Sequence, residues 1–387
     1  MIEIVRRGRG RAARGGLSPK SSTALRGAAG ALMLASAGAA QAQNECGLPE
    51  DGIVVCTPDG NPYPTGITYS TAEDLLLRIE SGVATSRGVR NDGAGGASVA
   101  IELEAGSIVI NSGLFAQGVS GFADAGGDVR IDSAGEIWTN GFLAAGIRAL
   151  AREDGSITIR AAHVDSTGGN GISVGGANGP VFVETYGHVR ATDGDGLFGD
   201  GLSSVAGIFV NTDGAVEVVN SGLIEQIGPG SFDPNGSYIT MGGISIRAFG
   251  DVVIAGDGIV ETSGWGATGI AVNGGGTASL RQASVTTHGE AAQAVGAAAP
   301  GDVSIDIDQV TSDLSIGISG FSRDGHVRIR FDSVSAESLG AYGETATGSV
   351  WVEAGDVTTT ASRTGLIGLA IQIQAGEVAD LAVGGAM

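Results

Sequence analysis

The chain has 387 residues, of which 69 are Gly and 42% are hydrophobic, and its formal net charge is −21 at pH 7. The apolar content is too high for a disordered chain, and the glycines lack the three-residue period of collagen. An acidic excess of this size repels nucleic acid and anionic lipid headgroups, so neither is an expected partner.

The first 42 residues differ in composition from the rest of the chain. Seven basic residues precede the apolar run 28–40, and Ala40-Gln41-Ala42 supplies the small residues of a cleavage site. This pattern predicts a signal peptide over residues 1–42 and export by the general secretory route. Its apolar run is well short of the roughly 20 residues of a membrane-spanning helix, and no transmembrane helix is expected in the mature chain. Loss of the segment would leave 14 basic and 41 acidic residues, a formal charge of −27.

Residues 43–95 contain the only two cysteines and are predicted to form a small cap over the repeats that follow. Cys46 and Cys56 are separated by nine residues, and in an exported protein the simplest expectation is a local disulfide. Metal binding or redox chemistry is the alternative, but no Cys-x-x-Cys motif and no nearby His supports it. The phrase Asn61-Pro-Tyr-Pro-Thr-Gly-Ile-Thr-Tyr69 and the apolar stretch Leu75–Ile79 complete this segment.

A short phrase then recurs about every 23 to 36 residues. It reads Gly-x-Val/Ile-x-Ile/Val, followed by another apolar residue five or six positions on and then by a Gly-Ile-like pair. The clear copies begin at Gly127, Gly155, Gly179, Gly214, Gly250, Gly276, Gly301, Gly325 and Gly348, with a weaker copy near Ala97. Apolar and polar residues alternate within each copy, which indicates a strand with one buried face.

Each copy predicts three short strands, which together make one turn of a coil. A single coil cannot bury its own apolar residues, but stacked equivalent coils bury a continuous column of Val, Ile and Leu. The predicted fold is therefore all-β: a right-handed parallel β-helix of about ten coils over residues 96–387. The residues after Gly376 are similar to the middle of another coil.

The Arg-rich leader, the Cys46/Cys56 loop, the phrase ending at Tyr69 and the Gly-rich coils resemble the passenger portion of bacterial autotransporters, particularly those of alphaproteobacteria. The resemblance covers nearly the whole chain. It implies a rod displayed outside the outer membrane and joined, in that family, to a C-terminal translocator barrel. Residues after Val350 leave no room for such a barrel. The expectation is therefore a fragment of a longer protein, a passenger that uses a translocator in trans, or a periplasmic rod.

An enzyme is the alternative, because parallel β-helices also include polysaccharide lyases and hydrolases. Those sites gather acids with Lys, Arg or His on one face of adjacent coils. After the leader this chain has no Lys, and His163 and His188 are expected to point outward from neighbouring coils as ordinary surface residues. We therefore predict no catalytic residue and a non-enzymatic adhesin or display scaffold, with a secreted lyase or hydrolase of acidic polysaccharide as the alternative.

Two neighbouring coils contain unusually long connections between their second and third strands. Residues 190–207 and 225–243 form these connections, whereas most coils use 7 to 12 residues. The second connection contains Phe232, Asn235 and Tyr238, residue types that recognition surfaces use, so both are predicted as loops for a carbohydrate or other cell-surface ligand. Insertions without a role are the alternative, since loops tolerate added length.

The first long connection also suggests a metal. Asp193, Asp195 and Asp200 alternate with glycines in a segment that resembles one degenerate Gly/Asp calcium-binding repeat. These three carboxylates are the candidate ligands for a weakly bound calcium ion. The alternative is a turn-rich loop without any ion, because such sites usually need several stacked repeats. No other cofactor is predicted.

Overall fold

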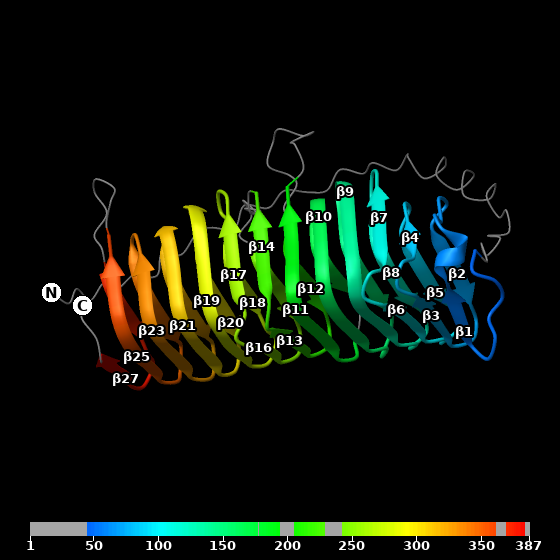
Figure 1. The fold of residues 1–387 in the computed structure, drawn as a ribbon. Coiled ribbons are helices and arrows are strands. Elements are labelled where there is room, and N and C mark those ends of the chain that lie inside the picture. Colours follow the sequence, from blue (N-terminus) through cyan, green and yellow to red (C-terminus); the bar gives the residue numbers. More distant parts are fainter. Residues whose placement is uncertain (1–44, 177, 194–204, 229–241, 361–368, 384–387) are drawn as a thin grey trace, which may run out of the picture. The chain divides into compact units, whose positions relative to one another are not determined.

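The computed structural model describes residues 45–176, 178–193, 205–228, 242–360 and 369–383. The chain divides between Gln41 and Ala42 into two units, and all described residues belong to the second. This second unit is a parallel β-solenoid of about 12 stacked coils (Figure 1). The predicted fold class, an all-β parallel β-helix, is confirmed.

Each coil contributes strands to three parallel sheets, here called the first, second and third sheets. The first sheet begins each coil. It contains β1 (Ile53–Cys56), β3 (Leu75–Ile79), β6 (Val99–Leu103), β13 (Val216–Asn220), β16 (Val252–Ala255), β27 (Ala379–Val383) and the first parts of β9 (Val129–Ala151), β10 (Ile157–Gly175), β11 (Val181–Thr192), β19 (Ala278–Glu290), β21 (Val303–Leu314), β23 (Val327–Ala336) and β25 (Val350–Thr359).

The second and third sheets complete each coil. The second contains β4 (Ala84–Thr85), β7 (Ile108–Ser112), β14 (Leu223–Ile227), β17 (Ile259–Ser263) and the later parts of β9, β10, β11, β19, β21, β23 and β25. The third contains β2 (Ile67–Thr71), β5 (Val89–Gly93), β8 (Gln117–Ala123), the ends of β9 and β10, β12 (Ile208–Thr212), β15 (Gly242–Ala248), β18 (Thr268–Asn273), β20 (Val295–Ala299), β22 (Ile316–Ser322), β24 (Leu339–Thr345) and β26 (Leu369–Gln374). A short 3-10 helix, η1 (Pro58–Gly60), follows β1.

The repeated phrase explains the core. Its two apolar residues face inward on the first sheet, and the strands pair in register, so equivalent residues lie directly above one another. Ile131, Ile159 and Val183, for example, stack in three successive coils and are each 0% exposed. The hydrophobic core is therefore a set of aliphatic columns that run through the stack, as the period predicted.

The coils begin earlier than the sequence indicated. Residues 43–95 were predicted as a cap, but β1 pairs with β3, β3 with β6, and β2 with β5. Leu75–Ile79 lacks the opening Gly of the phrase, so the repeat pattern does not include it. These early coils, together with β27 at the other end, raise the number of coils from the predicted ten to about 12.

A shorter segment, residues 45–50, lies against the first coil. The Cys46 N–H donates to the Tyr69 hydroxyl at 3.1 Å, and this hydroxyl donates to the Gly47 carbonyl at 2.9 Å. The predicted disulfide between Cys46 and Cys56 is confirmed. Cys56 is fully buried at the end of β1, in register with Ile79 of the next coil. The disulfide thus fastens the segment to the core of the first coil.

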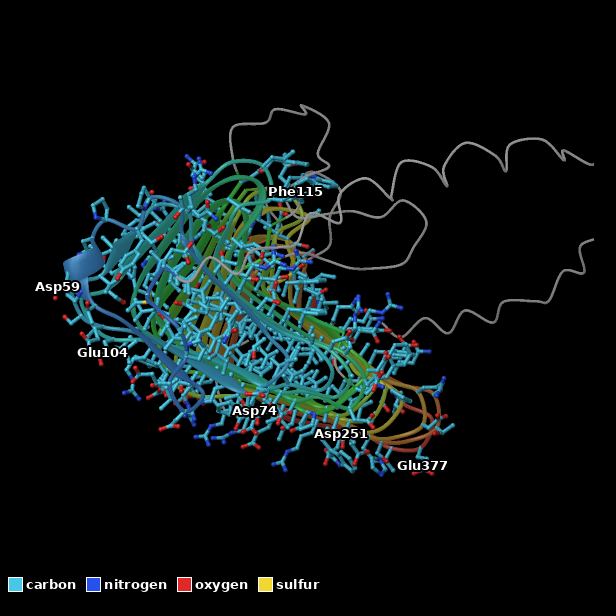
Figure 2. All side chains as sticks on the ribbon, turned by 90° about the vertical axis from the view of Figure 1, so that its right-hand side faces the viewer. Asp59, Asp74, Glu104, Phe115, Asp251 and Glu377 are labelled. Atoms are coloured by element: carbon cyan, nitrogen blue, oxygen red, sulfur yellow. A yellow bond between two sulfur atoms is a disulfide. The ribbon has the colours of Figure 1, made fainter. Side chains whose placement is uncertain are left out.

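Charged side chains occupy the outward positions of the sheets and turns. The exposed acids Asp74, Asp251 and Glu377 lie at the surface of the solenoid (Figure 2). Several Arg side chains pair with an acid of the neighbouring coil. For example, Arg160 Nε lies 2.9 Å from Glu184 Oε2 on the first sheet. Pairs this exposed contribute little to stability, so the inward columns dominate the folding energy.

Side chains at the start of the first-sheet strands link successive coils. Asp128, Asp251 and Asp302 each follow the Gly of their phrase, and each Oδ1 accepts the backbone N–H of the equivalent residue in the next coil at 2.7–2.8 Å. His326 has this position in a later coil, and its Nδ1 accepts the Ser349 N–H at 3.0 Å. The variable second residue of the repeated phrase therefore has a structural role.

Asp251→Ala is expected to destabilise the coil that begins at Thr277 by about 1 kcal/mol at neutral pH. Asp251 Oδ1 accepts the Thr277 N–H at 2.7 Å and its hydroxyl at 2.9 Å, and these bonds lower the pKa of Asp251. Because the folded-state pKa is below the unfolded one, this stabilisation is present at neutral pH and is lost as the pH falls through the folded-state pKa.

Thermal unfolding of wild type and Asp251→Ala from neutral to acidic pH measures this effect. The difference between the two proteins should shrink as the solution becomes acidic. Asp257→Ala, which changes an exposed acid in the following turn, is the matched control and should show no such trend. A difference that stays constant over the whole pH range would contradict the assigned role of the carboxylate.

Candidate binding groove

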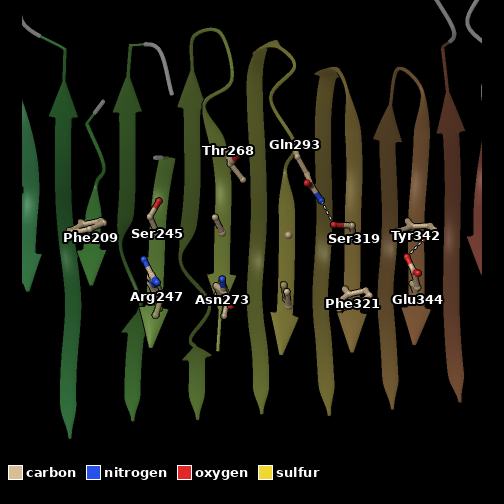
Figure 3. A pocket seen from close by; sticks show the side chains of 16 residues that line it. Phe209, Ser245, Arg247, Thr268, Asn273, Gln293, Ser319, Phe321, Tyr342 and Glu344 are labelled. Atoms are coloured by element: carbon tan, nitrogen blue, oxygen red, sulfur yellow. Dashed lines mark hydrogen bonds between the residues drawn. The ribbon is translucent and has the colours of Figure 1, made fainter. Parts of the chain in front are cut away.

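A groove of about 960 Å³ lies on the outward face of the third sheet (Figure 3). Its walls come from six neighbouring strands, β12, β15, β18, β20, β22 and β24. At about 4.8 Å between strands, the groove extends roughly 24 Å along the stack of coils. Its volume is at the upper end of the range of about 300–1,000 Å³ that is typical of ligand sites.

The groove exists because outward side chains are short in its middle and long at its ends. Ala271 and Gly296 are in register on β18 and β20 and form part of the floor. Ala298 continues the floor one row further along β20, in register with Phe321 of β22. Phe209 of β12 stands at the opposite end. Small residues between larger ones therefore hollow an otherwise even sheet face.

Two aromatic rings line one end of the groove. Phe321 is 41% exposed, and Tyr342 of the next coil is half-buried. The Tyr342 hydroxyl donates a hydrogen bond to Glu344 Oε2 (Figure 3). Burial, together with this bond to a carboxylate, raises the pKa of Tyr342 to about 12. At physiological pH the phenol therefore keeps its proton and donates to Glu344.

Amide and hydroxyl groups line the middle of the groove. The Gln293 amide donates to the Val295 carbonyl at 2.7 Å and to the Ser319 hydroxyl (Figure 3). The Gln293 side chain also lies over the floor, since a Cβ added at Gly296 would be only 3.3 Å from its amide atoms. Asn273 presents a further exposed amide on β18. The groove thus offers neutral hydrogen-bonding groups beside the aromatic rings.

Charge is sparse in this part of the surface. Among the described residues that line the groove, Arg247 and Glu344 are the charged ones. They lie on β15 and β24, four strands apart, which corresponds to roughly 19 Å. A glycosidase needs two carboxyl groups within about 10 Å of each other across the scissile bond. The described lining residues include one carboxyl group, that of Glu344.

His163 and His188 are placed as predicted, on neighbouring coils of the second sheet. They are paired in register, and their ring centroids are 5.9 Å apart. The Trp138 ring lies 5.3 Å from that of His163, and His188 Nε2 lies 3.3 Å from Glu225 Oε2. Within the described ranges no group of three or more His, Cys, Asp or Glu is arranged to hold a metal ion.

The residues predicted for ligand and calcium binding fall mostly outside the described ranges. Phe232, Asn235, Tyr238, Asp195 and Asp200 all lie there. Asp193 is described, and its backbone N–H donates to the Ile227 carbonyl at 2.7 Å.

The strands that follow the two long connections nevertheless line the groove. They run from β11 to β12 and from β14 to β15, and Phe209 of β12 and Arg247 of β15 line one end of the groove. Sequence reasoning missed the groove because Ala271, Gly296 and Ala298 read as ordinary small residues of a Gly-rich chain. A comparison of the outward positions of successive third strands would have shown the short side chains between long ones.

Comparisons with protein-family models, curated proteins and solved structures find no match for this chain. Within the described ranges, no helix is long and apolar enough to cross a membrane. The class of protein is defined by the fold and the site alone. It is a parallel β-solenoid with a groove on the outward face of one sheet. The observations that bear on function are this groove, the disulfide and the features of the sequence.

Proposed function

We propose that this protein is exported and acts at the cell surface as a non-enzymatic binding scaffold of the autotransporter passenger type. The observation that carries the proposal is the groove, which combines aromatic rings and neutral hydrogen-bonding groups over six coils. Its ligand is a carbohydrate or another component of a cell surface. A translocator provided in cis or in trans would bring the chain to the surface, and without one it would remain periplasmic.

Two features support export. The Arg-rich leader with its apolar run and Ala40-Gln41-Ala42 has the composition of a signal peptide. The Cys46–Cys56 disulfide fits an oxidising compartment, since most cytosolic proteins keep their thiols reduced. An acidic mature surface would also keep an exposed solenoid soluble.

The alternative, a lyase or hydrolase of acidic polysaccharide, is less well supported. Such an enzyme needs ionisable groups gathered around one bond of its substrate. Among the described groove residues, Glu344 already accepts a hydrogen bond from Tyr342, and the cation Arg247 lies at the far end. Degradation of an acidic polysaccharide by the purified chain would favour this alternative.

Expression of the full chain in a Gram-negative host tests export. We expect the exported protein to begin at Gln43, and a variant without residues 1–42 to stay in the cytoplasm. An exported chain that keeps its first 42 residues would contradict the predicted cleavage site, and retention of the full chain in the cytoplasm would contradict export.

Adherence of protein-coated beads to a panel of bacterial and animal cells tests binding. Ala298→Trp should abolish adherence, because the indole fills the floor of the groove. Ala100→Trp changes an outward Ala on the first sheet and serves as the matched control. Equal adherence of wild type and both variants would show that the groove is not the binding surface.

A further inference from the structure

The direction of the groove restricts the shape of its ligand. Its lining comes from six strands, while each strand contributes only one to four residues. A ligand that fills the groove therefore crosses the strands and follows the axis of the stack. It must be extended, since the groove is roughly 24 Å long by the strand spacing.

The groove does not suit a peptide that binds by strand addition. It lies on the face of the third sheet, and the strands that form it pair on both sides with their neighbours. Peptides that bind by main-chain hydrogen bonds need a free sheet edge. Recognition in this groove has to come from side chains.

Those side chains match the chemistry of a sugar chain. A pyranose ring presents C–H groups on its faces and hydroxyl groups around its rim. The rings of Phe321 and Tyr342 offer electron-rich faces for C–H groups. Gln293 Oε1 accepts from hydroxyls, and the Asn273 amide both donates to and accepts from them. Successive coils repeat such groups at about 4.8 Å, so consecutive sugar units meet consecutive coils.

The electrostatics of the chain select an uncharged sugar. The residues after position 42 carry a formal charge of −27, and Glu344 adds a carboxylate at the aromatic end of the groove. Arg247, the one cation among the described lining residues, is four strands away from it. A uronate or phosphate group on every sugar unit would be repelled along most of the groove.

We propose that the groove binds a linear, uncharged oligosaccharide that lies along the axis of the solenoid, with sugar units packed on Phe321 and Tyr342. This inference rests on the proposed function and specifies the ligand of the same site. Gln293, held by Ser319 across the floor, is the central hydrogen-bonding residue. Phe209 and Tyr342, on β12 and β24, mark the two ends of the bound segment.

Binding of the purified mature chain to a panel of linear oligosaccharides tests the proposal. The panel contains neutral glucan, xylan, mannan and galactan series from disaccharides to octasaccharides, and uronate oligosaccharides of equal length. At least one neutral series should bind, with an affinity that rises with length until the groove is filled. Uronate oligosaccharides should bind at least about tenfold more weakly, which corresponds to about 1.4 kcal/mol.

Variants connect that binding to the groove. Phe321→Ala and Tyr342→Ala should each weaken it at least about tenfold, as expected for aromatic anchors. Tyr342→Phe keeps the ring and should change affinity much less. Ala298→Trp should abolish binding. Trp351→Ala, which removes an exposed aromatic residue from the first sheet, is the control and should have no effect.

Three results would overturn the inference: no neutral series binds, uronate oligosaccharides bind more tightly, or Ala298→Trp binds like wild type. Circular dichroism spectra of each variant test whether it is folded. If no oligosaccharide binds but bead adherence remains sensitive to Ala298→Trp, the ligand assignment fails and the proposed function stands. If adherence is also insensitive to Ala298→Trp, both fail.

Discussion

Gly169→Ala is expected to destabilise the solenoid by at least about 3 kcal/mol, because two coils approach each other too closely for a side chain at this position. A Cβ at Gly169 would lie 1.6 Å from the Ala144 carbonyl oxygen and 2.5 Å from its carbonyl carbon. Both are backbone atoms of the neighbouring coil in β9, in register with this part of β10. They cannot rotate away as a side chain would, so the coils must separate.

The same strand offers a matched control. Gly175, at the end of β10, has its nearest neighbours 3.7 Å from an added Cβ, which is ordinary van der Waals contact. Gly175→Ala should therefore unfold at the same temperature as wild type, whereas Gly169→Ala should unfold at a much lower one or fail to accumulate. If both variants unfold at the wild-type temperature, β9 and β10 do not approach each other at Gly169 as closely as described.

This contrast shows why the sequence predicted the fold better than its details. The alternation in copies such as Val129/Ile131 depends on a local pattern, and it correctly identified the first-sheet strands from β6 to β25. Gly169, by contrast, is required by its close approach to the backbone of Ala144, 25 positions earlier in the chain. The sequence alone does not show which backbone atoms of a neighbouring coil lie against each glycine.

The groove also depends on contacts between coils that the sequence does not show. Ala271, Gly296 and Ala298 are unremarkable in sequence, and they form a floor only because two neighbouring coils place them side by side. The predicted loop residues, by contrast, stood out by type and by the length of their connections. In a single sequence, unusual residues are easier to recognise than positions where a side chain is small or missing. The long connections therefore indicated the coils that border the groove, but the sequence did not predict the groove itself.

Asn220 is a buried polar residue whose role depends on contacts between coils. Asn and Gly are common in turns, and the chain bends directly after Asn220, where the Gly222 N–H donates to Asn220 Oδ1 at 3.1 Å. In the structure it ends β13, is 0% exposed and faces the core. Glycines in the next coil make room for it: a Cβ at Gly258 would lie 2.4 Å from Asn220 Nδ2. The alternation alone would have placed an apolar residue there.

Asn220→Ala is expected to destabilise the middle of the solenoid by about 2–4 kcal/mol, because every hydrogen-bonding position of this amide is used. Its Oδ1 accepts from the Thr185 hydroxyl at 3.0 Å and from the Gly222 N–H at 3.1 Å. Its Nδ2 donates to Gln282 Oε1 at 3.0 Å and to the Ile259 carbonyl at 3.4 Å. Thr185 and Gln282 are buried, so in the variant the Thr185 hydroxyl and Gln282 Oε1 would lose this partner away from water.

Thermal unfolding and amide hydrogen exchange of these coils measure the loss, and Asn211→Ala, on the exposed face of β12, is the control that should change neither. A Gln282→Ala variant and the double variant complete the test. Because the two side chains bond to each other, the double variant should lose less stability than the two single losses added together. Fully additive losses, or an Asn220→Ala variant as stable as Asn211→Ala, would show that the buried amides do not stabilise this core as a connected network.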